Sequence, residues 1–411
     1  MRQRRVGVVG GSIGGLAAAW ELRRLGADVT VWERSAHRLE GRGAGIMLDP
    51  VLHAYLAQAG LVLHGLPVTR RLAIGRNERI LWTQAVGPTA TSWAQIHAAL
   101  RRALPDDAVQ AGCPVEAVRV AGDRAGLRAG GADVDGLDLL VGADGVESTV
   151  RRCLLPGTEP DYVGYVIVRG LVEEAAVPAA AATALQRLRD GAILYYLAPQ
   201  SHVIAYLVPG PDEGAACTAP GRRLVNWGWY VNLDAAALPA FLTDKDGQRH
   251  HLSLPPGALP EAQRRRLEAQ AAGLFAGSFP ALLAATERPF VQAITSCIAP
   301  RMALGPACLV GDAAHLIRPH AGSGAIAALQ DARALREALD GADDVAAGLQ
   351  RWEAVRLPAC RALHDLADRL GIAHQVEAND WERFSEADFE AWWAAAMQGG
   401  RLYFDKGKRR E

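Results

Sequence analysis

The sequence predicts an α/β fold in which a βαβ-type domain, assembled from distant segments, carries an inserted, mainly antiparallel β-sheet domain and a C-terminal helical segment. Three observations predict it. Residues 5–33 have the pattern of a strand, a glycine-rich turn, a helix and a second strand. Residues 162–233 contain successive runs typical of sheet strands, and residues 307–339 return to a strand, a loop and a long Ala-rich helix.

Composition narrows the class of function. The chain has 411 residues, which favours two domains or one domain with a large insertion. Its formal net charge of −1 and lack of long like-charge runs argue against nucleic acid as a partner. No stretch has the roughly 18 uncharged apolar residues of a membrane span. Six scattered cysteines without CxxC pairs indicate neither a metal site nor a disulfide framework. We expect a cytoplasmic protein that binds a small neutral or acidic molecule.

We expect the boundaries of these parts to fall between the periodic segments. The segments are 1–70, 93–160 and 289–374 for the βαβ-type domain, 71–92 and 161–288 for the inserted sheet domain, and 375–411 for the C-terminal helices. This last segment could form a lid or the surface of a homodimer.

Apolar runs and a terminating glycine predict the first βαβ unit. Arg5–Val9 is a short apolar strand, Leu16–Leu25 is a helix that Gly26 ends, and Asp28–Glu33 is a second strand. Later elements have the same kinds of signal. We expect helices over Pro50–Ala59 and Trp93–Leu104, short strands within Leu72–Trp82, and a meander with strands Val115–Val120, Gly126–Ala129 and Leu137–Val141.

The inserted domain and the end of the chain complete the element order. The expected strands are Tyr162–Leu171, Ala192–Leu197, His202–Val208, Leu224–Leu233, Phe290–Ala299 and Ala307–Val310, with helical periodicity over 255–287 and a helix over Ala325–Leu339. The order of apolar strand, loop and helix occurs twice in the chain. We expect the two segments with this order to share one ligand.

The turn of the first unit has a dinucleotide-binding pattern. In VGVVGGSIGGL, Gly10 permits the tight turn, Gly15 lets helix and strand approach, and the helix N-terminus offers N–H groups to a pyrophosphate. Ser12 departs from the usual second glycine. Glu33 ends the second strand, where an acid accepts hydrogen bonds from ribose hydroxyls. A plain structural turn is the alternative. The expected binding residues are Gly10, Ser12, Ile13, Gly14, Gly15, Glu33 and Arg34.

Two later motifs accompany it. DLLVGADGVESTVRR (138–152) delivers Asp144 and Gly145 into a turn before Arg151, although Asp-Gly alone is a hairpin signal. GDAAHLIRPHAGSG (311–324) places Asp312 after a strand and feeds glycines into a helix. We expect the dinucleotide fingerprint at the start of the chain and this second segment to hold one cofactor, and the combination points to FAD.

The segment 311–324 also suits a flavin ring physically. Pro319 lacks an N–H and fixes its φ, which suits a rigid wall beside a planar ring. Gly322 and Gly324 would let backbone N–H groups approach the ring, and the positive end of the following helix would favour its reduced, anionic form. The alternative is a helix-capping loop. The expected cofactor residues here are Gly311, Asp312, Pro319, Gly322, Ser323 and Gly324.

The three motifs, in this order, resemble the single-component flavin-dependent aromatic hydroxylases of the para-hydroxybenzoate hydroxylase-like class, over nearly the whole chain. The resemblance implies that Asp144, Gly145 and Arg151 lie near the pyrophosphate and the nicotinamide nucleotide, and that Gly311 and Asp312 hold the FAD ribityl and pyrophosphate. It also implies that NADH or NADPH reduces FAD, that O₂ forms a C4a-hydroperoxide, and that an electron-rich hydroxylated aromatic or N-heteroaromatic ring attacks its distal oxygen.

Within the family, the segments YVIVRG, HVIAYLVPG and NWGWYVN resemble the branch that hydroxylates dihydroxypyridines. One position departs from the wider family, which often has an arginine that reaches the FAD phosphates where this chain has Trp93. Arg42 could supply that cation, with Gly43 close to the flavin; a solvated arginine is the alternative.

The inserted domain offers polar and aromatic candidates for binding a ring. Because alternate residues of a strand share a face, Trp227 and Trp229 should point one way and Tyr230 the other. One face should cover the flavin and the other should pack on helices. The expected substrate residues are Arg169, Tyr196, Tyr206, Trp227, Tyr230 and His320.

His320 and Pro319 are the candidate catalytic residues. An imidazole beside the flavin could exchange a substrate proton near neutral pH, whereas a capping or packing histidine is the alternative. His315 suits a helix surface. The competing functions are a halogenase, whose WxWxIP pattern is missing from this chain, an epoxidase, an oxidase without NAD(P)H, or a non-catalytic flavin-binding sensor.

Overall fold

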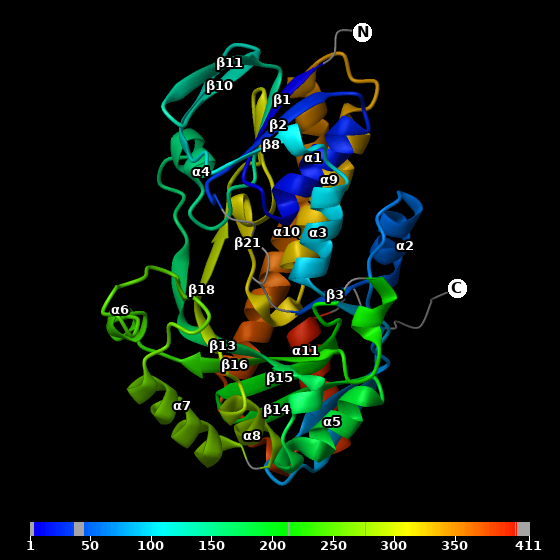
Figure 1. Cartoon of the computed structure of the whole chain (residues 1–411), viewed down its shortest axis with the longest axis vertical. Coiled ribbons are helices and arrows are strands. Elements are labelled where there is room, and N and C mark those ends of the chain that lie inside the picture. The colour runs from blue at the N-terminus through cyan, green and yellow to red at the C-terminus, as the bar shows by residue number, and fades with distance from the viewer. Residues whose placement is uncertain (1–3, 37–44, 213, 276, 399, 401–411) are drawn as a thin grey trace. The chain divides into compact units, whose positions relative to one another are not determined.

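The computed structural model describes residues 4–36, 45–212, 214–275, 277–398 and 400 (Figure 1). The chain forms two compact units. Unit 1 comprises Met1–Arg42, Trp93–Asp161 and Thr295–Ala367, and unit 2 comprises Gly43–Ser92, Tyr162–Ile294 and Asp368–Glu411. Residues 45–70 therefore belong to unit 2, because β3 (Gly45–Leu48) pairs with β7 (Thr89–Ser92). The sequence pattern had suggested the βαβ-type domain for these residues.

Unit 1 is built on a largely parallel sheet. Its order is β19-β20-β12-β1-β2-β8, with β1 between β12 and β2. Only β19 runs antiparallel to its neighbour. The strands are β1 (Arg5–Val9), β2 (Asp28–Glu33), β8 (Val109–Ala111), β12 (Leu139–Gly142), β19 (Ala303–Leu304) and β20 (Ala307–Leu309).

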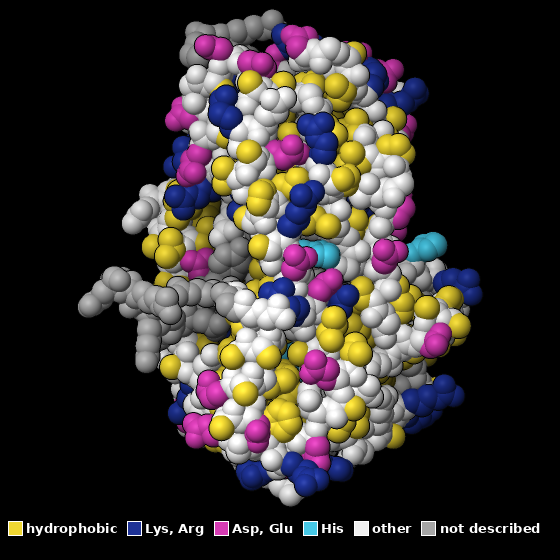
Figure 2. Space-filling view, turned by 180° about the vertical axis from the view of Figure 1, so that it is seen from behind, with side chains coloured by type: hydrophobic (Ala, Val, Ile, Leu, Met, Phe, Trp, Pro, Cys, Tyr) yellow, Lys and Arg dark blue, Asp and Glu magenta, His cyan; other side chains and the backbone are white. Residues whose placement is uncertain are grey.

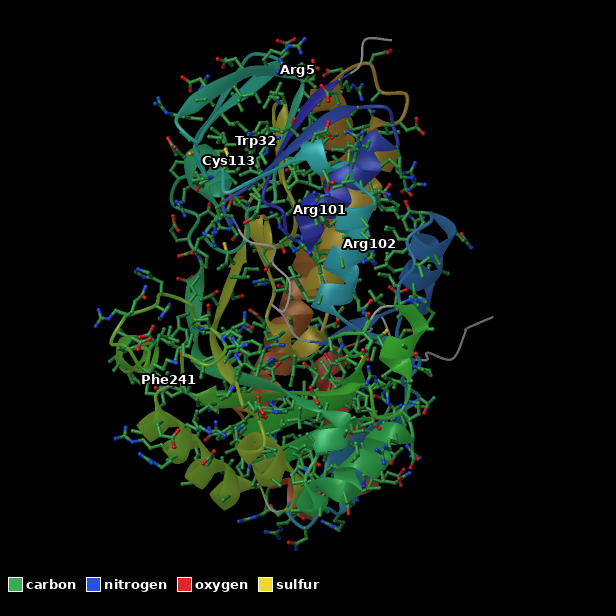
Figure 3. All side chains as sticks on the ribbon, in the orientation of Figure 1. Arg5, Trp32, Arg101, Arg102, Cys113 and Phe241 are labelled. Atoms are coloured by element: carbon green, nitrogen blue, oxygen red, sulfur yellow. The ribbon has the colours of Figure 1, made fainter. Side chains whose placement is uncertain are left out.

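Helices of unit 1 pack beside this sheet. Helix α1 contacts both α9 and α3, which lie next to it in Figure 1. The last turn of α3 is basic and ends in Arg101 and Arg102, labelled in Figure 3, where cations complement the helix dipole. The helices are α1 (Ile13–Arg23), α3 (Trp93–Arg102), α4 (Thr149–Leu154), α9 (Gly324–Leu339) and α10 (Val345–Gln375), which ends in unit 2, with 3₁₀ turns η1 (Asp106–Ala108), η5 (Gly311–Ala313) and η6 (Pro319–Ala321).

The predicted meander is present with one difference. Strands β9 (Val115–Ala121), β10 (Arg124–Ala129) and β11 (Ala132–Leu137) form a separate three-stranded sheet. The predicted third strand, Leu137–Val141, was wrong as one element: β11 ends at Leu137, and β12 joins the parallel sheet beside β1. One apolar run therefore serves two sheets, which periodicity alone does not separate.

Unit 2 contains a large, mainly antiparallel sheet. Its strands follow the order β17-β18-β13-β16-β15-β14-β5-β6, in which β14 and β5 pair in parallel. They are β5 (Arg70–Ile74), β6 (Ile80–Ala85), β13 (Asp161–Glu173), β14 (Ala192–Ala198), β15 (Ser201–Val208), β16 (Leu224–Asn232), β17 (Ser253–Leu254) and β18 (Phe290–Ile298), whose end pairs with β21 (His315–Leu316). A small sheet, β3-β7-β4, includes β4 (Leu66–Pro67).

One face of the large sheet forms the core of unit 2. Trp227 and Trp229 are fully buried there and make edge contacts to Phe279, with ring centroids 5.4 and 5.8 Å away. Each indole N–H has a partner, Thr286 for Trp227 and Ser201 for Trp229. The helices of unit 2 are α2 (Pro50–Gln58), α5 (Ala182–Arg189), α6 (Leu238–Phe241), α7 (Glu261–Leu274), α8 (Ser278–Ala284) and α11 (Glu386–Met397), with 3₁₀ turns at Glu174–Ala176, Ala179–Ala181, Gly214–Thr218 and Trp381–Arg383.

The C-terminal segment packs on this unit. Helix α11 begins with a capping box between Ser385 and Asp388. Phe389 stacks on Trp82 at 6.0 Å, and Trp393 lies over the guanidinium of Arg71 at 4.4 Å. Residues 401–411, the rest of the predicted segment, lie outside the described residues.

The surface carries both signs of charge. In Figure 2, acidic and basic side chains are interspersed over the visible face without a large patch of one sign. None of the helices within the described ranges combines the length and the apolar character that crossing a membrane requires.

A buried carboxylate in unit 2 should make stability depend on acid pH. Glu174 is 1% exposed and accepts hydrogen bonds from Arg223, Arg189 and the N–H of Gly221. Burial raises its pKa, but these bonds outweigh burial and lower the pKa to about 2.

We therefore predict that Glu174 stabilises the fold by about 3 kcal/mol above pH 4.5, and that this contribution is lost as the pH falls toward 2. Urea unfolding of wild type and Glu174→Gln at pH 7, 4 and 3 measures it. The difference between the two proteins should shrink as the pH falls; a difference that stays constant with pH would contradict the prediction.

Candidate functional site

At two positions, Gly10 and Gly15, the glycine-rich turn of unit 1 leaves no room for a side chain. Gly10 has a φ of 105°, and a Cβ there would lie 2.3 Å from the carbonyl oxygen of Ala143. A Cβ on Gly15 would lie 1.8 Å from the carbonyl oxygen of Gly10. Ser12 is the N-cap of α1, and its side chain makes no capping hydrogen bond. The turn thus brings bare backbone and a helix N-terminus together, as an approaching pyrophosphate requires.

Glu33 fixes the edge of this turn. Its carboxylate accepts hydrogen bonds from the N–H of Gly11 at 2.7 Å and of Ser35 at 2.8 Å. It follows Trp32, labelled in Figure 3, at the end of β2. Its position as the last residue of the strand is the one from which the sequence predicted a ribose contact.

A histidine that the sequence did not single out holds the same turn. His97 of α3 is buried, and its Nε2 lies 3.1 Å from the carbonyl oxygen of Gly11. Because a carbonyl only accepts, Nε2 carries the proton. Trp93 stacks on this imidazole with ring centroids 4.6 Å apart. The aromatic residue at position 93 therefore supports the turn through His97.

Two charged side chains organise the segment 144–151 of unit 1. The Asp144 carboxylate accepts from the N–H groups of Thr149 and Val150 and from the hydroxyl of Ser148, so it caps α4. The guanidinium of Arg151 is 1% exposed and donates to backbone carbonyls. The four acceptors are those of Val146, Thr158, Asp312 and Ala313.

This arrangement corrects the role suggested for Arg151. A buried guanidinium that donates to four backbone carbonyls does not extend to a phosphate, so Arg151 positions the segments 144–151 and 311–313. Gly145 has a φ of 77° and nothing within 4 Å of a Cβ, so its backbone borders open space. Open space beside a glycine suits the close approach of a ligand.

The turn 311–313 presents one acidic side chain. Gly311 and Ala313 are buried, whereas Asp312 between them is exposed. A Cβ on Gly324, the first residue of α9, would lie 3.9 Å from Oδ1 of Asp312. Asp312 thus lies beside the N-terminus of α9.

The loop before α9 is compact. The N–H of Gly322, in the left-handed region with a φ of 63°, donates to the carbonyl of Pro319. Ser323 is the N-cap of α9, and its hydroxyl donates to the carbonyl of Ala321 at 2.6 Å. His320 is buried in this turn. His315, expected on a helix surface, is instead 1% exposed in β21, where it pairs with Asp331 of α9.

In unit 2, the sheet face opposite the aromatic core carries Arg169, Tyr206 and Tyr230, and we call it the tyrosine face. Cross-strand register puts the three on one side, because Ile167 pairs with Tyr230 and Tyr206 pairs with Asn226. Burial raises the pKa of both tyrosines above 10, although the charge of Arg169 lowers it. Both phenols are therefore neutral near pH 7.

Two of the predicted substrate residues lie on the other face. Tyr196 pairs with Val203, which pairs with Trp229, so Tyr196 and Trp227 point into the aromatic core. Both are under 2% exposed and contact Phe279. They are packing residues, because the strand period that puts Tyr206 and Tyr230 on the tyrosine face excludes them from it.

Gly45 lies against the tyrosine face. Its N–H donates to Oδ1 of Asn226 at 2.9 Å, and a Cβ there would lie 2.4 Å from the ring of Tyr206. The predicted cation Arg42 and its neighbour Gly43 lie outside the described residues. Arg34, the last predicted residue of the first motif, is exposed and faces Glu147 at 3.8 Å.

The residues of unit 1 fit a dinucleotide. Side-chain-free turns at Gly10 and Gly15, the acid Glu33, the exposed Asp312 and two helix N-termini supply the donors and acceptors that FAD needs. Asp331 was missed by the sequence reasoning, although an acid on the buried stripe of α9 was a visible signal.

The turn makes a sharp prediction. Gly15→Ala should destabilise the protein by about 2 kcal/mol, since its methyl group overlaps the backbone of Gly10. Gly14→Ala is the matched control, because its Cβ would meet Ala328 at an ordinary 3.5 Å. Urea unfolding of the two variants compares them. Equal stability of the two would show that the turn relaxes freely and would refute the close-approach constraint.

Comparisons with known proteins agree with this geometry. Three family models match: an NAD(P)-binding Rossmann-like domain over residues 8–64, an FAD binding domain-like model over 162–296 and an FAD binding domain over 284–367. The 2,6-dihydroxypyridine 3-monooxygenase of Paenarthrobacter nicotinovorans is 32% identical over 86% of this chain and 87% of its own. The 3-amino-4-hydroxybenzoate 2-monooxygenase of Streptomyces cremeus is 30% identical over 90% and 87%.

Solved structures give the same result. That of 2,6-dihydroxypyridine-3-hydroxylase from Arthrobacter nicotinovorans matches with a TM-score of 0.82 and 29% identity, over 91% of this chain and 93% of that one. Klebsiella pneumoniae HpxO, solved with FAD and uric acid, shares the fold at 24% identity and a TM-score of 0.72, over 96% and 93%. With its Rossmann-like sheet, its FAD-binding domain and these relatives, the chain belongs to the class A FAD-dependent aromatic hydroxylases.

Proposed function

We propose that this monooxygenase hydroxylates an electron-rich ring that carries an ionised or strongly polarised oxygen, a hydroxylated benzene or pyridine, with NADH or NADPH as electron donor. The observation that carries the proposal is Arg169 on the tyrosine face. Its Nε is buried and has no hydrogen-bond partner among the described residues. A cation held among neutral phenols favours an anionic, planar ligand.

The relatives support the same class of ring. Their names specify dihydroxypyridine and aminohydroxybenzoate as substrates, which are rings with oxygen substituents. Tyr206 and Tyr230 add aromatic surface with neutral hydroxyl groups that donate to such oxygens. The face therefore offers one cation for charge and two phenols for orientation. Tyr196 and Trp227 are not part of the proposed site.

Tyr230 is held in place from behind. It stacks on His202 with centroids 4.3 Å apart and an interplanar angle of 12°. The Nδ1 of His202 lies 2.9 Å from Oε1 of Gln375, and the Gln375 amide in turn donates to Asn232. This chain of contacts fixes the ring plane of Tyr230, and a fixed ring plane would orient a stacked substrate.

For the cofactor, we propose direct contacts from the backbone of residues 10–15 to the pyrophosphate, from Glu33 to a ribose, and from Asp312 to the ribityl or pyrophosphate. The backbone at Gly322–Gly324 and the N-terminus of α9 would meet the flavin edge. Pro319 and Gly145 would border it. Arg151 would act through its carbonyl contacts.

The net reaction is ring–H + O₂ + NAD(P)H + H⁺ → ring–OH + NAD(P)⁺ + H₂O. One oxygen atom enters the ring C–H bond, the other leaves as water, and NAD(P)H supplies two electrons. Bound FAD supplies the electron transfer and the activation of O₂. The chain orients the ring through Arg169 and the phenols, and the near-complete burial of Tyr206 and Tyr230 keeps water from that face.

A substrate panel tests the function. We predict that hydroxylated pyridines or benzoates accelerate NAD(P)H oxidation at least tenfold and yield one hydroxylated product per NAD(P)H. Because Arg169 would make a charge-assisted hydrogen bond, Arg169→Met should raise KM for ionised rings about tenfold or more. For their neutral methyl ethers, KM should change little.

Several outcomes would reject parts of this proposal. If no ring accelerates NAD(P)H oxidation and the reduced protein does not react with O₂, hydroxylation is wrong and a sensor is favoured. Substrate oxidation without NAD(P)H would indicate an oxidase. An equal rise in KM for ionised and neutral rings would remove Arg169 from the recognition of charge.

His320 makes a separate prediction. If its imidazole exchanges a substrate proton, His320→Phe should lower kcat by about 100-fold, within the usual range of acid–base catalysis, and leave the FAD Kd within about twofold. His251→Phe, at an exposed loop histidine, is the control. Stopped-flow product formation between pH 6 and 9 measures both. Wild-type turnover across that range would exclude His320 from the chemistry.

A further inference from the structure

A buried cluster of polar and charged side chains adjoins the turn that carries Asp312. Asp331 of α9 is 0% exposed and His315 of β21 is 1% exposed. Arg356 and Cys360 come from α10 and are also buried. Nothing in the proposed chemistry uses these four side chains. Burying charged side chains costs free energy, which close ion pairs and hydrogen bonds must offset.

The two oxygens of Asp331 have different tasks. Oδ2 accepts from the N–H of Gly311 at 3.0 Å and lies 2.6 Å from Nε2 of His315. Oδ1 accepts from Nε of Arg356 at 2.8 Å. One oxygen atom thus holds both ends of the segment 311–315, and the other oxygen anchors the carboxylate to α10.

The charges of the cluster are mutually stabilised. Burial lowers the pKa of His315, but the charge of Asp331 outweighs burial and raises it well above 6.5. Burial raises the pKa of Asp331, but His315, Arg356 and the Gly311 N–H outweigh it and lower this pKa. His315 is therefore protonated and Asp331 ionised near neutral pH. Oδ2 of the carboxylate accepts hydrogen bonds from both the His315 imidazolium and the Gly311 N–H.

A metal site is the competing explanation. His315, Asp331 and Cys360 offer ligand atoms within 4.8 Å of one another. However, Arg356 donates to the same carboxylate at 2.8 Å and lies 3.7 Å from the sulfur of Cys360. The permanent positive charge of Arg356 beside Asp331 and Cys360 repels a metal ion. In addition, Oδ2 of Asp331 already accepts hydrogen bonds from Gly311 and His315. The cluster therefore serves the turn.

The turn itself needs this support. Gly311 has a φ of 58°, and a Cβ there would lie 3.1 Å from that of Ala328 on α9. The N–H of Gly311 donates to Asp331. Three residues further along, the carbonyl of Ala314 accepts from the N–H of Ala299. Between these fixed ends, only the side chain of Asp312 is exposed.

We propose that Asp331 is a positioning residue for FAD: by holding Gly311 and His315 with one carboxylate oxygen, it presents Asp312 to the cofactor. This rests on the proposed contact between Asp312 and FAD. Asp331 touches no cofactor atom in this scheme and acts only through the turn. Loss of its geometry should therefore weaken FAD binding well beyond any loss of fold stability.

The test compares FAD affinity with stability. In Asp331→Asn, an NH₂ that faces Gly311 and His315 removes their acceptor, and an NH₂ that faces Arg356 breaks the bond that anchors the side chain to α10. The Kd for FAD, from quenching of flavin fluorescence on the full-length apoprotein well below its Tm, should rise at least tenfold. Trp352→Phe is the matched control, because it loses the hydrogen bond to the backbone carbonyl of Asp331 at 3.1 Å but leaves the carboxylate intact. Its Kd should stay within twofold even though its Tm falls.

A second pair guards against misfolding of Asp331→Asn. The amide of Gln can donate to Oδ2, so His315→Gln should keep the FAD Kd within threefold, whereas His315→Leu should raise it at least tenfold. Equal Kd values for the two variants, or a wild-type Kd in a destabilised Asp331→Asn, would overturn the positioning role. Asp312→Ala separates the two proposals: an unchanged Kd there refutes the cofactor contact itself, whereas a raised Kd with normal Asp331→Asn binding refutes only the positioning.

Discussion

The cofactor-binding part of unit 1 depends on one buried cation. Arg151 cannot lose its charge, and at 1% exposure its guanidinium is stable only where carbonyl oxygens surround it. Two of those oxygens belong to Asp312 and Ala313, far along the chain. This single side chain therefore ties the Asp-Gly segment to the turn that carries Asp312. The close backbone contacts at Gly10 and Gly15 add a second constraint, because no side chain fits at either position.

Behind the contact residues lies a set of side chains that hold backbone in place. His97 fixes the carbonyl of Gly11, Glu33 fixes its N–H, and Asp331 fixes the N–H of Gly311. Each bond uses a side chain from a different element to satisfy a buried or half-buried backbone group. Such networks are rigid because an unpaired group in a poorly solvated place costs more than the bond gains. A cofactor site built from backbone thus needs polar supports that never touch the cofactor.

The large sheet of unit 2 separates packing from recognition by strand period. Trp227, Trp229 and Tyr196 fill the core on one face, and Arg169, Tyr206 and Tyr230 occupy the other. Alternation along β16 was predictable from the sequence, and the structure confirms that Trp227 and Tyr230 point to opposite sides. The assignment of Tyr196 to the ligand was not sound, because the phase of β14 relative to β16 depends on cross-strand register, which one strand does not encode.

By itself, the sequence determined the fold class, the order of the elements and the motifs of the FAD-binding domain, because helix and strand periods, glycine positions and local turns are short-range properties. It also determined the family, since three motifs occur in a fixed order. Only the tertiary structure decided that Arg151 supports the backbone, that His315 is buried against Asp331, and that β11 and β12 belong to different sheets. Those outcomes depend on partners more than a dozen residues away, and long-range burial, which sets the state and the role of a charged side chain, is absent from local pattern.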